Sequence, residues 1–323
     1  RGAEVIRHEH PQGPAAARNS GLAEVRTGVV AFLDSDVEVA PGWLSPLLAH
    51  LLDGRVAAVA PRVRSAPGTG FLADYEEQHS PLDLGSQPAN VRPRSRISYV
   101  PSAALLFRSE AARSLGGFDE SMRYGEDVDL TWRAVAAGHL VRYEPASVVE
   151  HRPRRNWRDW LTQRVAYGSS AAALDARHPA TAAPVDCSGW SLAAWASIAA
   201  GHPALGVTLA AGSSAALVRK LEAVPAMNAA ALAMGGHAAA GRQLARALVR
   251  PWWPATLGVS LVSLRARRVL SVALAVELMG RSGGLRDRTV SLLDDAAYGT
   301  GVWLGAWRQR SPRALLPRVG RWP

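Results

Sequence analysis

One short stretch of the chain, GGFDESMRYGEDVD at residues 116–129, concentrates side chains that could do acid–base chemistry. Its carboxylates are Asp119, Glu120, Glu126, Asp127 and Asp129. An apolar-periodic run at residues 128–137 follows at once, so we expect a helix to begin at residues 125–127 with acid in its first turn. Carboxylates there can simply cap the helix and complement its dipole. A carboxylate held at a rigid helix edge could instead take a proton from a substrate hydroxyl.

A second acidic pair, Asp34 and Asp36 in the motif Asp-Ser-Asp, directly follows the continuous apolar run at residues 29–33. That run predicts a buried strand, and ligands of open α/β sheets bind beyond the carboxyl ends of strands. Two hard carboxylates there could hold Mg²⁺ or Mn²⁺, with a diphosphate filling other coordination positions. The alternative is an ordinary loop turn, since Asp-x-Asp recurs at residues 127–129.

The segment GPAAARNSG at residues 13–21 precedes this pair and favours a helix made of small residues. Small residues let a helix approach a sheet closely, which is one sufficient reason for the pattern. Arg18 and Asn19 could alternatively point toward a nucleotide phosphate or toward the Asp34 loop.

Three more residues follow the last expected strand. His151 opens the polar run HRPRR, and a neutral imidazole there could complete a metal site, although surface histidines are common. Arg164 and Tyr167 share one face of the next helix, so Arg164 could reach a phosphate while Tyr167 packs or hydrogen-bonds nearby. Packing of an amphipathic helix explains the same spacing.

Hydrophobic periodicity predicts an α/β fold in the first half of the chain. Short apolar runs alternate with helical patterns, which favours a mostly parallel sheet with flanking helices. We expect strands at residues 3–7, 29–33, 56–63, 97–107 and 140–149, and helices at 13–26, 43–52, 71–78, 109–115, 128–137 and 157–174. Residues 64–96, rich in Pro, Gly, Ser and charge, predict a long functional loop region.

The composition changes after about residue 184. Residues 187–218 contain no Asp, Glu, Lys or Arg, and further charge-poor runs at 224–241, 251–264 and 269–279 are separated by arginines. We therefore expect two domains, 1–183 and an Ala-rich helical region at 184–323. This tail is either an Ala-rich helical domain or a set of membrane or interfacial helices with arginines at the headgroups, and we expect membrane association.

The net charge of +10 does not predict nucleic-acid binding. Lys220 is the only lysine, and the arginines are scattered with no basic–aromatic interleaving. Cys187 is the only cysteine, so no intramolecular disulfide is available. Because the chain begins with Arg1 and a strand-like run, we expect that N-terminal residues of the parent protein are missing.

The ordered motifs RN-G, DSD, GGFDE and GEDVDL, followed by a strand and a histidine, resemble the family 2 glycosyltransferases of the GT-A fold over residues 1–175. The resemblance implies a nucleotide-sugar donor, a metal held by Asp34, Asp36 and His151, and a general base at Asp127 beside Glu126. We further expect Arg18, Asn19, Asp34 and Arg164 to bind the donor, and Asp129 and Tyr167 to contact the acceptor. The nucleotide-holding first strand and the VVDDGS-like strand of the family are absent here, which supports truncation and leaves open that the fragment is inactive. The missing Q-x-x-R-W signature argues against processive synthesis.

A narrower resemblance rests on SPLDLG at 80–85, VRP at 91–93, SYVPSAAL at 98–105 and YGSSAAALDARHP at 167–179. These segments resemble the mycofactocin-system glycosyltransferases. The resemblance implies the addition of glucose to a peptide-derived redox cofactor precursor. We expect this transfer to be metal-dependent and inverting, to use UDP-glucose, and to occur at the cytoplasmic face of a bacterial cell membrane. Two alternatives stay open: a lipid-linked or cell-envelope glycan acceptor, and a non-catalytic membrane-attached sugar-binding scaffold.

Overall fold

The computed structural model describes residues 2–320 and divides into two compact units, Arg1–Gln163 and Arg164–Pro323. The division lies inside helix α6 (Trp157–Arg177), earlier than the compositional boundary at residues 183/184. Packing explains the difference. The first turn of α6 belongs to the first unit, where the buried indole of Trp160 donates to Glu76 Oε1 at 2.7 Å. Beyond it, Gly168 packs against the backbone of a helix of the second unit.

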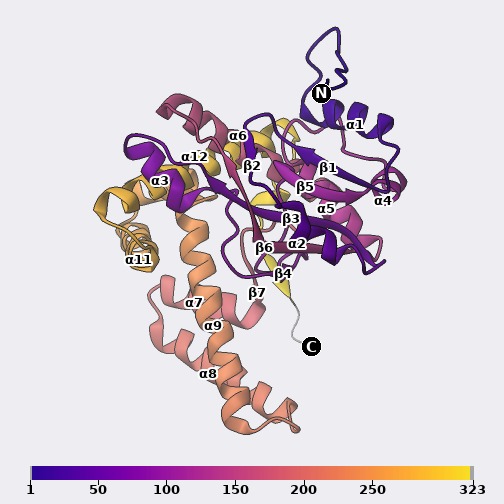
Figure 1. Ribbon diagram of the computed structural model, residues 1–323. Helices are drawn as coiled ribbons and strands as arrows, with labels where there is room; N and C mark the ends of the chain where they lie inside the picture. The colour runs from indigo at the N-terminus through magenta and orange to yellow at the C-terminus, as the bar shows by residue number, and fades with distance from the viewer. Residues whose placement is uncertain (1, 321–323) are drawn as a thin grey trace. The chain divides into compact units, whose positions relative to one another are not determined.

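The first unit is built on a six-stranded sheet (Figure 1). Its main strand order is β1-β5-β3-β6-β2, and β4 pairs with β6. The strands are β1 (Val29–Leu33), β2 (Val37–Val39), β3 (Val56–Ser65), β4 (Ala89–Asn90), β5 (Ala104–Arg108) and β6 (Leu140–His151).

The prediction of a mostly parallel sheet is wrong. Within residues 2–320, β3 and β6 form the only parallel pair of this sheet, and the other paired strands are antiparallel. Strands β1, β3 and β6 do run in one direction. However, β5 is inserted between β1 and β3 in the opposite direction, after a long segment at residues 66–103 that contains one helix and β4.

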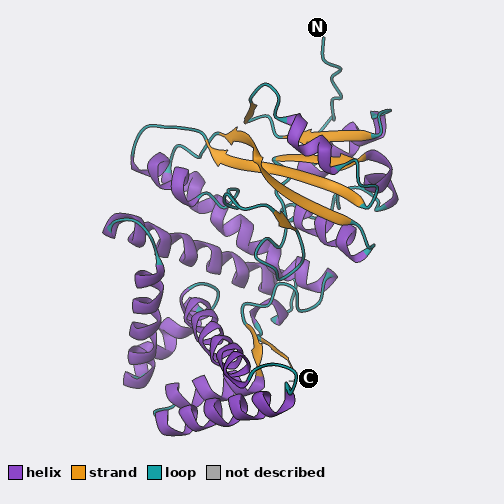
Figure 2. Cartoon of the chain, turned by 60° about the horizontal axis from the view of Figure 1, so that its bottom comes forward, coloured by secondary structure: helices purple, strands orange, loops and turns teal. Residues whose placement is uncertain are grey.

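Helices cover both faces of this sheet (Figure 2). They are α1 (Pro14–Glu24), α2 (Leu44–His50), α3 (Phe71–His79), α4 (Ser109–Ser114), α5 (Glu126–Ala136) and the start of α6. Leu105 and Phe107 of β5 pack with Leu130 of α5 in one core, and Leu106 packs with Leu47 of α2 in another. A strand covered on both faces needs no polar alternation, which explains the continuous apolar run of β5.

The predicted helices of this unit are confirmed within a few residues, and so are three of the five expected strands. The expected strand at residues 3–7 is wrong, because these residues are irregular and exposed. The expected strand at residues 97–107 begins only at Ala104. The preceding residues form an irregular loop that Trp132 holds through a bond from its Nε1 to the Ser98 carbonyl at 2.7 Å.

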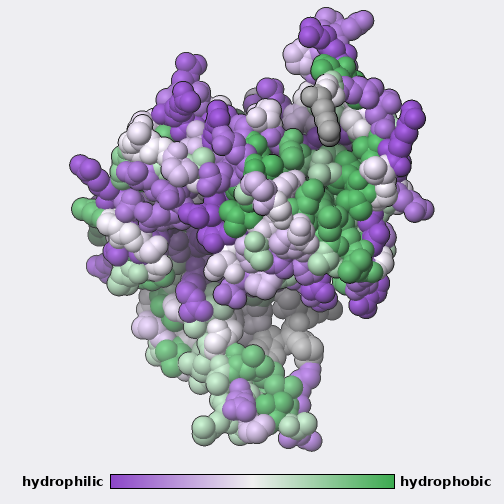
Figure 3. Space-filling view, in the orientation of Figure 1, coloured by the Kyte–Doolittle hydropathy of each residue, from purple (hydrophilic) through white to green (hydrophobic). Residues whose placement is uncertain are grey.

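The second unit is helical, with β7 (Asp186–Ser188) and β8 (Arg318–Gly320) as a small parallel pair. Its helices are the remainder of α6, α7 (Gly189–Ala199), α8 (Pro203–Lys220), α9 (Ala226–Val249), α10 (Trp253–Val262), α11 (Leu264–Gly280), α12 (Leu285–Arg308) and the 3₁₀ turn η1 (Arg313–Leu315). Ala229, Ala233 and Ala240 of α9 are buried, so much of the alanine serves close helix packing. Large apolar side chains are exposed on α8 and α9, including Val207, Met227 and Leu232. Figure 3 shows hydrophobic surface in this part of the second unit.

None of the helices described between residues 2 and 320 has both the length and the apolar character needed to cross a bilayer.

Candidate active site

The acidic stretch of the sequence forms the N-terminus of α5, as predicted. Gly125 is the N-cap in a left-handed conformation (φ 81°), and Glu126, Asp127 and Asp129 lie in the first turn. A left-handed backbone is easily adopted only by glycine, so Gly125 allows the chain to turn sharply into the helix. The turn places adjacent carboxylates where the helix dipole favours negative charge.

Asp127 is held by two backbone amides and keeps part of its surface exposed. Its Oδ1 accepts from the Val128 N–H at 2.8 Å, and its Oδ2 accepts from the Ser102 N–H at 3.1 Å. Partial loss of contact with water raises the pKa of Asp127 above that of an ordinary aspartate, and the two amide bonds only partly oppose this. A raised pKa makes the carboxylate a stronger base once it is deprotonated. Ser102 was not predicted as a site residue, because a backbone contact carries no side-chain signal.

Arg18 links the two acidic motifs. Its Nη2 donates to Asp34 Oδ1 at 2.6 Å, and its Nη1 donates to Glu126 Oε1 at 2.7 Å. Burial alone would lower the pKa of Arg18, but Asp34 and Glu126 raise it, so the guanidinium stays charged. The pKa of Glu126 is raised by burial and by the Asp127 carboxylate, against the opposing charge of Arg18. The structure therefore brings Arg18, Asp34 and the Glu126–Asp127 pair into one charged network.

Asn19 uses its side-chain amide within the protein. Its Nδ2 donates to the Phe118 carbonyl and to Glu120 Oε1, both at 2.8 Å, and its Oδ1 accepts from the Phe118 N–H at 2.8 Å. Gly117 lies against this amide with φ 67°, where an added Cβ would be 2.5 Å from Asn19 Oδ1. Asn19 therefore fixes the GGFDE segment onto α1. The donor contact expected of Asn19 stays a prediction beside this positioning role.

Asp36 and His151 face each other across the β2–β6 ladder. His151 Nε2 lies 3.4 Å from Asp36 Oδ1, and Val37 pairs with His151 in the register. Burial lowers the pKa of His151, while the carboxylates of Asp36 and Asp34 oppose the shift. A neutral imidazole and a carboxylate are suitable donors for Mn²⁺, and carboxylates suit Mg²⁺.

The predicted metal set of Asp34, Asp36 and His151 is not assembled as three ligands. Within residues 2–320, no group of three His, Cys, Asp or Glu side chains is arranged to hold a metal ion. The reason at Asp34 is its ion pair with Arg18. The Asp36–His151 pair still fits a divalent cation, and the Asp34 carboxylate is close enough to influence the imidazole.

Asp129, expected to contact the acceptor, has a different role. Its side chain is fully buried, and Arg133 Nε donates to its Oδ2 at 2.7 Å. Arg133 also donates to the carbonyl oxygens of Leu115 and Gly117. The Asp129–Arg133 pair, which shares one face of α5 at i,i+4 spacing, therefore fastens α5 to the segment that precedes it.

Arg164 and Tyr167, expected to bind the donor and the acceptor, lie on α6 within the second unit. There the buried Arg164 guanidinium pairs with Asp294 of α12 at 3.1 Å. Their helical spacing was predicted correctly, but the face they share includes a buried ion pair. Nothing in the local sequence indicates a partner that is 130 residues away.

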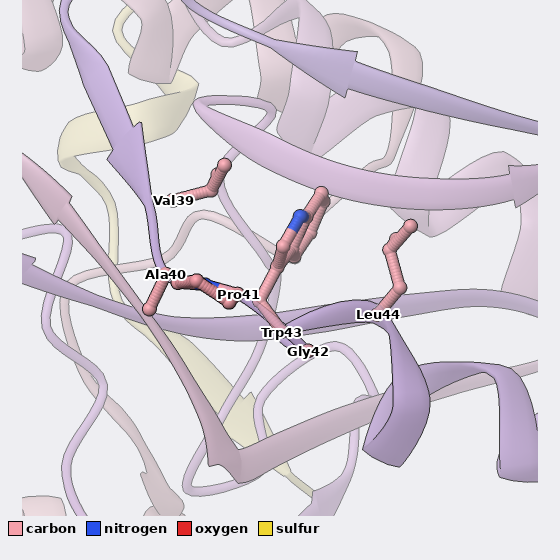
Figure 4. Close-up of a pocket in the computed structure, with 6 residues that line it drawn as sticks. All are labelled: Val39, Ala40, Pro41, Gly42, Trp43 and Leu44. Atoms are coloured by element: carbon pink, nitrogen blue, oxygen red, sulfur yellow. The ribbon is translucent and has the colours of Figure 1, made fainter.

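A cavity of about 420 Å³ lies at the connection from β2 to α2 (Figure 4). None of the residues that line it belongs to the charged network of Arg18, Asp34, Glu126 and Asp127. Its lining is Val39, Ala40, Pro41, Gly42, Trp43 and Leu44. The Trp43 backbone carbonyl at this place accepts from Ser147 Oγ at 2.6 Å. The lining is apolar, so this cavity offers no acid–base or metal chemistry.

Comparison with known proteins places these observations in a family. The family model described as glycosyl transferase family 2 matches residues 1–115. A pre-mycofactocin glycosyltransferase of Mycobacterium tuberculosis (strain ATCC 25618 / H37Rv) is 43% identical over 336 residues, which covers 98% of this chain and 72% of the relative. A probable polypeptide N-acetylgalactosaminyltransferase 8 of Homo sapiens is 29% identical over 172 residues, covering 47% of this chain and 26% of the relative.

Two solved structures show weaker likeness. The mannosyltransferase PcManGT from Pyrobaculum calidifontis, in complex with GDP-Man and Mn²⁺, is 18% identical with a TM-score of 0.48, covering 94% of this chain and 70% of its own. GalNAc-T7 with UDP, GalNAc and Mn²⁺ is 18% identical with a TM-score of 0.37, covering 47% of this chain and 32% of its own.

Proposed function

Because the chain belongs to the family 2 glycosyltransferases, we propose that it transfers a sugar from UDP-glucose to a peptide-derived redox cofactor precursor. The name of the relative that is 43% identical over almost the whole chain supports the acceptor class. The observation that carries the chemistry is the partly exposed Asp127 carboxylate, fixed by two amides at the N-terminus of α5.

In the proposed reaction Asp127 is the general base. One of its carboxylate oxygens takes the proton of the acceptor hydroxyl while the oxygen of that hydroxyl attacks the anomeric carbon of the sugar. The bond from the anomeric carbon to the nucleoside diphosphate breaks on the opposite side, so the configuration at this carbon inverts. Asp127 is the better candidate of the pair, because the Glu126 carboxylate is engaged by Arg18. The Asp127 carboxylate accepts from backbone amides instead.

A divalent ion, Mg²⁺ or Mn²⁺, would be held by Asp36 and His151, with Asp34 nearby. Such an ion supplies Lewis-acid neutralisation of the diphosphate that leaves. The low pKa of His151 keeps its imidazole neutral and able to coordinate at neutral pH.

The test is Asp127→Asn in a transfer assay with UDP-glucose and the peptide-derived acceptor. Loss of the base should lower turnover by about 10²- to 10⁴-fold. Donor affinity measured by calorimetry should stay unchanged, because Asp127 contacts the acceptor. Glu120→Gln is the matched control, since Glu120 is an exposed carboxylate of the same stretch. Turnover near that of the wild type in Asp127→Asn would remove Asp127 from the role of base.

We also propose that the protein works at the cytoplasmic face of a bacterial cell membrane. The specific support is the exposed aliphatic and arginine-rich surface of the second unit at α10 and α11. A lipid-linked glycan is the second candidate acceptor, because this surface would bring such a molecule to the protein. The same transfer assay with a lipid-linked acceptor separates the two acceptor classes.

A further inference from the structure

Helices α10 and α11 form a tight hairpin in which a single residue, Ser263, separates Val262 from Leu264. The turn is well satisfied. The Ser263 N–H donates to the Val259 carbonyl at 3.1 Å, and Ser263 Oγ accepts from the Ala266 N–H at 3.3 Å. Arg267 caps the end of α10 by donating to the carbonyls of Ser260 and Leu261 at 2.7 and 2.9 Å. The tip is therefore a defined structure and holds its side chains in fixed directions.

The tip exposes large aliphatic side chains. Val262 is 88% exposed, Leu261 70% and Leu264 68%. Single exposed aliphatic residues are ordinary, but a contiguous group at the end of a hairpin is typical of a surface that meets another apolar phase. Polar residues would suit this turn equally well, so the geometry of the turn does not explain why aliphatic residues occupy these positions.

Arginines surround the same tip. Arg265, Arg267 and Arg268 are exposed in the first two turns of α11, and no Asp or Glu occurs between residues 251 and 276. Cations near a helix N-terminus are opposed by the helix dipole. Arg267 caps α10, but Arg265 and Arg268 lie where the α11 dipole opposes them, so an external anion would be a favourable partner for these two residues.

An open apolar cavity of about 470 Å³ continues this surface toward the interior of the second unit. Its lining includes Leu248 of α9, Trp252, Val259 of α10, and Arg265, Val269 and Leu270 of α11. Val259 and Arg265 belong both to the cavity and to the surroundings of the tip. The apolar surface beside the arginines therefore includes a cavity as well as the exposed tip.

We propose that the α10–α11 hairpin inserts into the interface of a bilayer that contains anionic phospholipid. Leu261, Val262 and Leu264 would enter the boundary between headgroups and acyl chains, and the arginines would contact lipid phosphates. A second copy of the chain is a poorer occupant, because a two-fold contact at this tip would bring the arginines of both copies together. The inference identifies the membrane contact of the proposed function.

The experiment is flotation of the purified protein with vesicles of phosphatidylcholine alone, or mixed with an equal part of phosphatidylglycerol. We expect binding to the mixed vesicles and at least about tenfold weaker partitioning to phosphatidylcholine. The double variant Arg265→Gln/Arg268→Gln should lower partitioning to mixed vesicles about thirtyfold. Leu261→Ser/Val262→Ser should lower it at least about tenfold.

Leu52→Ser is the matched control, because Leu52 is an 89% exposed leucine of the first unit, and it should float like the wild type. Circular dichroism and size-exclusion chromatography accompany each variant. Equal partitioning to both vesicle types, wild-type flotation of the tip variants, or a change of oligomeric state in place of lipid binding would each overturn the proposal. No donor or acceptor is present, so this outcome is independent of whether sugar transfer is correctly assigned.

Discussion

Replacing Asn19 by alanine tests the inference that this residue fixes the acidic stretch onto α1. The substitution removes the acceptor of the Phe118 N–H and a donor to the Phe118 carbonyl, both at 2.8 Å. Phe118 as a whole residue is only 2% exposed, so water has poor access to the two backbone groups. The third bond, to Glu120, is exposed and contributes little.

The expected loss of unfolding free energy follows from the two bonds to Phe118. A buried hydrogen bond contributes about 1 kcal/mol, and a backbone group left without a partner costs about 1 to 3 kcal/mol. We expect Asn19→Ala to lower the free energy of unfolding by about 2 to 3 kcal/mol in total. For a unit of this size, that corresponds to a melting temperature lower by about 4 to 12 °C.

Urea unfolding followed by circular dichroism measures the free energy, and hydrogen exchange of residues 116–122 measures whether the Phe118 amide has lost its protection. Glu120→Ala is the control, and it should change the free energy of unfolding by less than about 0.5 kcal/mol, because it removes only the exposed bond. If Asn19→Ala is as stable as Glu120→Ala and Phe118 stays protected, water replaces the amide and the positioning role is refuted.

Three further changes test the neighbouring parts of the site. Arg18→Gln should lower turnover and move the acidic limb of the pH–rate profile to higher pH, because losing the positive charge raises the pKa of Glu126 and Asp127 further. Arg18→Lys should leave the limb nearly in place, and an unmoved limb in Arg18→Gln would contradict the network. His151→Ala should weaken Mn²⁺ binding in calorimetry by at least about tenfold, and unchanged affinity would exclude this residue as a ligand. Gly117→Ala should lower the free energy of unfolding by about 1 to 3 kcal/mol through strain at φ 67°. In an Asn19→Ala background the loss should be smaller, because the close contact with Asn19 Oδ1 is gone, and strictly additive losses in the double variant would argue against that contact.

Features that depend on neighbouring residues could be predicted from the sequence. The start of α5 follows from Gly125 and the periodic run behind it, and both lie within one short stretch. The Asp-Ser-Asp pair at the end of β1 and His151 at the end of β6 follow from apolar runs that stop at polar residues. In each case the signal and the structure it forms are separated by only a few positions.

Features that depend on distant partners could not be predicted. The direction of β5 depends on how the long segment at residues 66–103 folds back, and hydrophobic periodicity does not encode strand direction. The role of Asp129 depends on Arg133, which was available at i,i+4 spacing, but also on the Leu115 and Gly117 carbonyls that Arg133 reaches. The role of Arg164 depends on Asp294 in a helix much later in the chain.

The division of one guanidinium between Asp34 and Glu126 has a consequence for ionisation in the site. Each of the two nitrogens of Arg18 serves a different carboxylate, so a change of charge at one carboxylate alters the field that the other experiences. Neutralising Asp34, as in Asp34→Asn, removes a negative charge that competes for Arg18, so the pKa of Glu126 should fall. By thermodynamic reciprocity, protonating Glu126 strengthens the hold of Arg18 on Asp34. Arg18, which holds the Asp34 carboxylate, therefore also sets how readily the Glu126–Asp127 pair loses its protons. Substitutions at either acidic motif should shift the acidic limb of the pH–rate profile.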